Sequence, residues 1–179
     1  ARTFGSLTKR PRQEHGTENC NELHHKVLKE RMSKFESDPQ LGQEELTRIV
    51  QLWLDCWKTN QVAIAPNEMF QWTETRRSIK PHMAAYHILL DGVVAARKKR
   101  AVGDEAAALA ETILRRMLAI VESASADRDS ENLDTLNMAY TFHKVMTLFC
   151  QEKDVASAER LLRELEQLHT SDPDTFPLH

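Results

Sequence analysis

The sequence is poor in residues that interrupt helices. Its 179 residues contain only five glycines and six prolines, and alternation of polar with β-branched residues is nearly absent. Because glycine and proline disfavour helix interiors and half-buried strands need such alternation, the composition favours an all-α fold. No apolar run approaches the roughly 20 residues that a membrane-spanning helix requires, so we expect no membrane span.

The sequence also contains few cysteines and has a small net charge. The three cysteines, at positions 20, 56 and 150, form no CxxC pair, which disfavours a disulfide framework or a zinc ribbon. The formal net charge of −3 disfavours non-specific binding to polyanions. A glycine-rich phosphate loop, GxSxG and HExxH are absent from the sequence. We therefore expect no enzyme activity, no cofactor, no small-molecule substrate and no metal site.

What the sequence does contain is an internal repeat. An aromatic residue followed by histidine occurs at 86–87 and again at 142–143. Each is followed by a helix-forming segment with the pattern Ala-Glu-x-aliphatic-Leu-Arg, at 110–115 and at 158–163. The first segments repeat after 56 residues and the second after 48, so the turn between them is eight residues longer in the earlier copy. Turns can grow in this way without disturbing the packed faces of a repeat.

The spacing of apolar residues predicts seven helices. Apolar residues recur every three or four positions within 19–36, 42–60, 67–75, 83–96, 105–123, 136–151 and 155–169. We expect Trp53 and Trp57, four residues apart, to be core residues rather than base-stacking residues. The helices would pair into about three stacked hairpins, an α-α superhelix or solenoid. The expected parts are a basic, disordered extension at 1–18, a diverged first hairpin plus connector at 19–82, a second repeat at 83–135, and a third repeat with a C-terminal segment at 136–179.

The repeat resembles the pentatricopeptide repeat family. Ile-Lys-Pro-His at 79–82 precedes Tyr-His-Ile-Leu-Leu-Asp-Gly at 86–92, similar to the family's Ile-Lys-Pro-Asp and Tyr-Asn-x-Leu-Ile-Asp-Gly. Phe-Cys-Gln-Glu-Lys-Asp at 149–154 is similar to its Phe-Cys-Lys-x-Gly-Asp junction. The resemblance covers 78–169 and implies that Ala158, Leu161, Leu162 and Leu165 bury the seam between hairpins. The related tetratricopeptide repeat is the alternative, although its Trp/Leu-Gly-x-x-Tyr pattern is not visible.

The resemblance implies binding of single-stranded RNA on the surface of the first helices, in a mitochondrion or a chloroplast (plastid), for RNA processing, stabilisation or translation. The family's base-reading and stacking positions map onto His82, Ala84, His87, Tyr140 and His143. The phosphate-binding candidates are the consecutive cations Arg97, Lys98, Lys99 and Arg100. Their alternative role is to stabilise the end of a helix through its dipole.

The alternative function is a protein-interaction scaffold, or a structural subunit of a large organellar assembly such as a ribosome. The family prefers Asn, Ser or Thr where this chain has His87 and His143, and a partly buried structural histidine is the alternative role of both. The repeat units differ in length, and residues 145–179 carry seven acidic but only three basic side chains. These features motivate the protein-scaffold alternative, whereas the family resemblance makes RNA binding the expected function.

Overall fold

The computed structural model describes residues 18–59, 64–75, 79, 81–99, 105–126, 138–173 and 176. These residues form helices and no strand, which confirms the predicted all-α class. The helices are α1 (Glu18–Ser37), α2 (Gln43–Lys58), α3 (Pro66–Glu74), α4 (Met83–Lys98), α5 (Ala106–Ala126), α6 (Met138–Gln151) and α7 (Val155–Ser171). Each predicted helix is present, with ends within three residues of the predicted ones. Most of the predicted extension, residues 1–17, lies outside the described residues.

Local chemistry sets where several helices begin. Pro66 occupies the first turn of α3, where its missing N–H costs no hydrogen bond. His82 precedes α4, and its ring Nδ1 accepts a hydrogen bond from the Ala84 N–H at 3.5 Å. Asp154 precedes α7, and its carboxylate accepts from the Ser157 N–H at 3.1 Å. Such caps satisfy N–H groups that have no partner inside the helix.

The turn between α6 and α7 reverses the chain within three residues. The Asp154 N–H donates to the Phe149 carbonyl at 2.9 Å, and the Lys153 N–H donates to the Cys150 carbonyl at 3.1 Å. This is the Schellman pattern of helix termination, which requires a left-handed residue after the last turn. Lys153 takes that conformation, with φ of 63°, at the position where the family junction has glycine.

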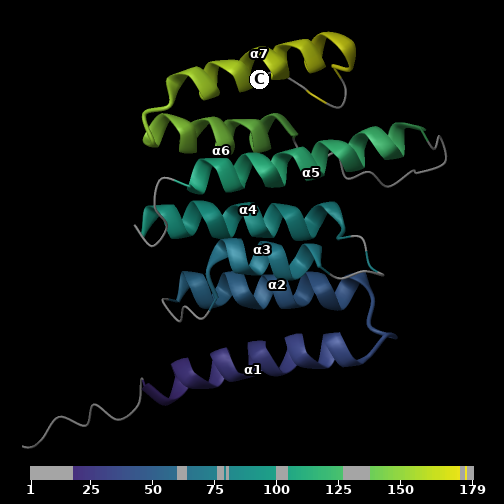
Figure 1. Cartoon of the computed structure of the whole chain (residues 1–179), viewed down its shortest axis with the longest axis vertical. Helices are drawn as coiled ribbons and strands as arrows, with labels where there is room; N and C mark the ends of the chain where they lie inside the picture. Colours follow the sequence, from purple (N-terminus) through teal and green to yellow (C-terminus); the bar gives the residue numbers. More distant parts are fainter. Residues whose placement is uncertain are drawn as a thin grey trace, which may run out of the picture.

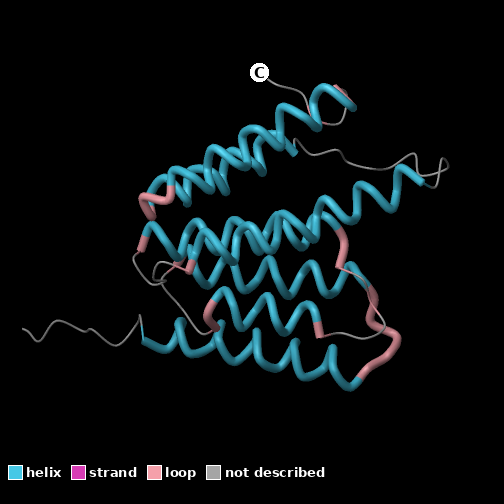
Figure 2. Tube along the Cα trace, turned by 45° about the horizontal axis from the view of Figure 1, so that its top comes forward, coloured by secondary structure: helices cyan, strands magenta, loops and turns pink. Residues whose placement is uncertain are grey.

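The helices stack in chain order along the longest axis of the molecule, from α1 to α7 (Figure 1). Each helix from α3 onward packs against the next one, α1 packs against α2, and α2 packs against α4. Figure 2 shows the same stack from a second direction, in which the helix axes at one end are tilted relative to those at the other end. This packing between neighbours is what the sequence predicts for an array of helical hairpins.

Side-chain contacts also join alternate helices. The rings of Phe35 in α1 and Trp72 in α3 lie 5.8 Å apart, and Arg116 Nε of α5 lies 2.9 Å from Glu74 Oε2 of α3. A further ion pair joins Lys144 of α6 to Asp91 of α4. The stack therefore has two rows, which we call the odd row (α1, α3, α5 and α7) and the even row (α2, α4 and α6).

The core is continuous through both rows. Trp53 and Trp57 of α2 are buried, as predicted, and both indole N–H groups donate to the Ile64 carbonyl, at 2.9 and 3.1 Å. Gly92 of α4 faces the Trp53 ring, which allows α2 and α4 to approach closely. In the described part of the chain, no helix has both the length and the apolar character needed to cross a membrane.

Candidate functional site

Two of the predicted RNA-binding residues line a hollow in the even row. His82 and Ala84, at the start of α4, lie across from residues at the start of α2, and the hollow has a volume of about 440 Å³. Glu44 and Arg48, also in its wall, are 3.5 Å apart and form an ion pair. Because that pair has no net charge, the hollow offers little excess attraction for a phosphate.

Tyr140 and His143 lie on α6 with exposed side chains. Tyr140 is 54% exposed, and the Lys144 ammonium lies 4.5 Å from the centre of its ring. That ammonium also pairs with Asp91 of α4. His87, at the matching position on α4, is half-buried. Tyr140 is therefore accessible, but its neighbouring cation is already balanced by a carboxylate.

The predicted phosphate-binding cations lie at the opposite end of α4. Arg97 and Lys98 form its last turn, and Lys98 lies about 24 Å along the helix axis from His82. The Lys99 ammonium donates to the Trp57 carbonyl at the end of α2. This contact places the Lys99 ammonium at the C-terminal end of α2, where a positive charge is favourable. Arg100 lies outside the described residues.

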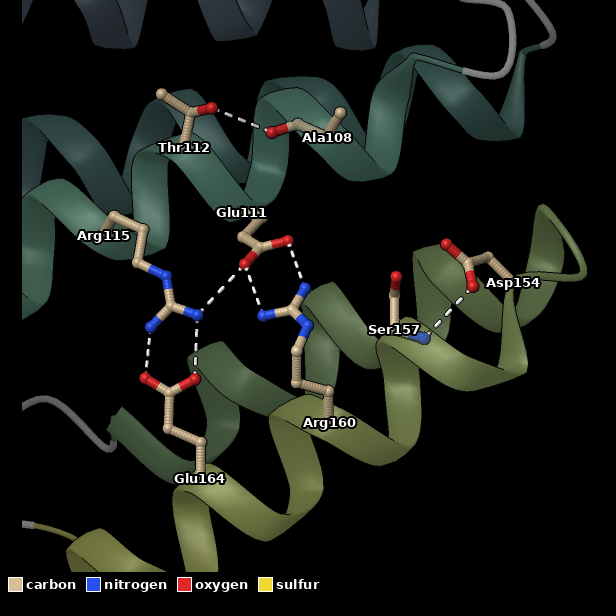
Figure 3. A network of polar contacts seen from close by, with 8 residues as sticks. All are labelled: Ala108, Glu111, Thr112, Arg115, Asp154, Ser157, Arg160 and Glu164. Atoms are coloured by element: carbon tan, nitrogen blue, oxygen red, sulfur yellow. Dashed lines mark hydrogen bonds and ion pairs between the residues drawn. The ribbon is translucent and has the colours of Figure 1, made fainter.

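A charged network that sequence analysis missed joins α5 to α7 (Figure 3). Glu111 accepts two hydrogen bonds of 2.8 Å from Arg160 and one of 3.0 Å from Arg115. Arg115 in turn donates two hydrogen bonds to Glu164. The hydrogen bond from Arg160, followed by that from Arg115, lowers the pKa of Glu111 despite its partial burial. The acid–base pair Glu111–Arg115 of α5 thus contacts the base–acid pair Arg160–Glu164 of α7, and all four charged groups form hydrogen bonds.

The outer face of α7 repeats a face of α5 that is buried. Shifting α5 by the 48-residue repeat places Val155 at the position of Ala107 and Leu162 at the position of Leu114. Ala107 and Leu114 have no exposed surface, whereas Val155 is 57% and Leu162 is 44% exposed. Of the four residues that the family resemblance predicts to bury the seam between hairpins, Ala158, Leu161 and Leu165 are buried. The fourth, Leu162, is exposed.

The charged pair of α5 is repeated on α7 as well. Glu159 and Arg163 correspond to Glu111 and Arg115, and they form an ion pair of 3.2 Å within α7. Both of their side chains are exposed, while the side chain of Glu111 is largely covered. The 48-residue repeat was the sequence signal that could have revealed this surface.

Within the described ranges, no three His, Cys, Asp or Glu side chains are placed to hold a metal ion. Comparisons with protein-family models, with curated proteins and with solved structures find no match. The surfaces of the chain itself are thus the basis for inferring its function.

Proposed function

We propose that this chain is a helical-repeat protein that acts as a protein-interaction scaffold in an organellar assembly and performs no catalysis. In this proposal, α4–α5 and α6–α7 are successive hairpins of a solenoid. The observation that carries it is the exposure of Val155 and Leu162 at positions whose repeat equivalents are fully buried. The resemblance to pentatricopeptide repeats supports the mitochondrial or plastid location.

The exposed apolar residues make this face a place where binding is favourable. Removing a valine or leucine side chain from water stabilises a complex by about 1.5–3 kcal/mol when burial is complete. Single exposed apolar residues are ordinary on protein surfaces. Here, however, two of them occur at positions that the repeat uses for packing, beside the repeated Glu159–Arg163 pair. A surface of this composition fits a helical protein segment better than it fits a polyanion.

The test is affinity purification of the tagged chain from its native compartment, with protein and RNA identified in the same sample. Leu162→Glu places a charge on the open face, and Ala119→Glu places the same charge on an exposed position of α5 as a matched control. We expect wild type and Ala119→Glu to recover the same defined proteins, and Leu162→Glu to lose them. Because both positions are exposed, both variants should keep the wild-type melting temperature. Recovery that is unaffected by Leu162→Glu would refute the scaffold role of this face.

RNA binding is the second candidate, and the exposed Tyr140 ring with its neighbouring Lys144 is the observation that favours it. Stacking of one base on an aromatic side chain contributes about 1–3 kcal/mol. If the site binds single-stranded RNA, Tyr140→Ala should weaken binding by roughly 5- to 150-fold. Thr147→Ala, at another exposed position of α6, should leave the affinity unchanged. A titration at low and moderate salt decides the question, and no binding at micromolar protein would exclude this function.

A further inference from the structure

The outer face of α1, the first helix of the odd row, carries an alternating pattern of charge. Leu23 is 57% exposed. Lys26 and Glu30 follow, paired at 3.9 Å with both side chains largely in solvent, and Lys34 is exposed one turn later. The face therefore presents an apolar residue, a cation, an anion and a cation in order along the helix.

The outer face of α7, the last helix of the same row, presents the opposite pattern. The exposed residues Val155, Glu159, Arg163 and Glu166 supply an apolar residue, an anion, a cation and an anion. Figure 1 shows that α1 and α7 lie at the two ends of the stack and run in the same direction. If the two faces were laid together in parallel, each charge would meet one of opposite sign.

The contact between α5 and α7 provides a template for such a pairing. There Glu111 meets Arg160 and Arg115 meets Glu164, so an acid–base pair faces a base–acid pair with the same four-residue spacing. Both contacts join residues 49 positions apart, which shows that α5 and α7 are parallel. On α7, Glu159 and Arg163 repeat the acid–base order found on α5. On α1, Lys26 and Glu30 have the base–acid order of the residues that contact α5.

We propose that the outer face of α7 binds the outer face of α1 of a second copy of this chain. In this arrangement Glu159 pairs with Lys26, Arg163 pairs with Glu30, and Val155 packs near Leu23. The inference rests on the proposed scaffold function, because it names the occupant of the same α7 face. Since the two faces differ, the contact is head to tail and leaves one free face at each end. Further copies can therefore add to the assembly.

The apolar contacts and the charges have different parts in this interface. Exposed ion pairs contribute little to affinity and are weakened by salt. Juxtaposed like charges are strongly unfavourable, so the charge pattern chiefly selects the partner face and its register. Self-association should consequently weaken as salt is raised, and reversing the charges of one face should be more damaging than neutralising them.

The experiment measures self-association by sedimentation velocity, from low to high micromolar protein. The α7 swap is Glu159→Arg with Arg163→Glu, and the α1 swap is Lys26→Glu with Glu30→Lys. We expect each swap alone to weaken association at least about tenfold, because it places like charges together. A chain carrying both swaps should associate as wild type does. An equimolar mixture of the two singly swapped chains should also associate, since it contains one matching pair of faces of each kind.

The matched control exchanges Asp55 and Lys58 of α2, another exposed pair within one helix, and should leave association unchanged. Wild type that remains monomeric at low salt would overturn the inference. An α1 swap without effect, or a doubly swapped chain that fails to associate, would do the same. If wild type is monomeric while Leu162→Glu still loses its native protein partners, the scaffold proposal stands and only the identity of the occupant is wrong.

Discussion

Replacing Gly92 by alanine should destabilise the fold, because the added methyl group would collide with the core. A Cβ atom built on Gly92 would lie 2.1 Å from Cη2 and 2.2 Å from Cζ3 of Trp53. Trp53 has no exposed surface, and its Nε1–H donates to the Ile64 carbonyl. The indole ring can therefore make room only by disturbing the surrounding core or by losing that hydrogen bond.

The size of the effect follows from opposing contributions. Alanine is favoured over glycine inside a helix by about 1 kcal/mol. Overpacking a core costs about 1–3 kcal/mol, and leaving a buried donor without a partner costs about 1–3 kcal/mol more. With all three contributions present, we expect Gly92→Ala to lower the free energy of unfolding by about 1–5 kcal/mol, measured by urea denaturation followed by circular dichroism.

Two further variants separate crowding from other effects of the mutation. A methyl group on Gly42 would have no neighbouring atom within 4 Å, so Gly42→Ala should cost only about 0.5 kcal/mol, as a poorer helix cap. Trp53→Phe removes the ring atoms that would clash, so Gly92→Ala should cost less in that background than in wild type. A Gly92→Ala chain as stable as wild type would mean that helix propensity outweighs crowding, and would refute the reasoning.

Three other changes test separate parts of the fold. Lys153→Gly should stabilise the chain by about 1 kcal/mol in thermal unfolding, because glycine adopts the left-handed conformation without strain. Tyr86→Phe should destabilise it by about 1.5 kcal/mol in urea, through loss of the 2.5 Å hydrogen bond from the phenol to Glu74. The lowered pKa of Glu111 stabilises the fold above the ordinary carboxyl pKa of 4.5, and this contribution disappears as the pH falls through the lowered value. The stability difference between wild type and Glu111→Gln, followed by urea titration from pH 7 downward, should therefore shrink below about pH 4.5; a constant difference would contradict this role.

Helix positions were predictable because they depend on residues close together in sequence. The spacing of apolar residues identified even the short α3, and it placed Trp53 and Trp57 in the core. Which helix covers which residue depends on contacts between distant segments. The contact of Lys99 with the Trp57 carbonyl joins residues 42 positions apart, and no local pattern distinguishes it from a solvated cation.

The candidate sites were predictable only in part, for a related reason. His82 and Ala84 lie together because they share the start of α4, but the opposite wall of their hollow comes from α2. Leu162 has the spacing of a buried residue and is nevertheless exposed. Periodicity identifies which side of a helix is apolar, whereas burial also requires a neighbour to cover that side.

The packing of each helix mainly against those one or two places along the chain has a consequence for how the protein unfolds. If the helices form the proposed repeat array, cooperativity depends largely on the coupling between neighbouring helices. A helix that packs against other helices on only one side should open before a helix that is packed on both sides. Backbone amides of α1 should therefore exchange with deuterium sooner than those of α4. Head-to-tail association would place a helix against the outer faces of α1 and α7, which no other helix of the described residues covers. The same contact that extends the array would then slow the local opening from which its unfolding begins.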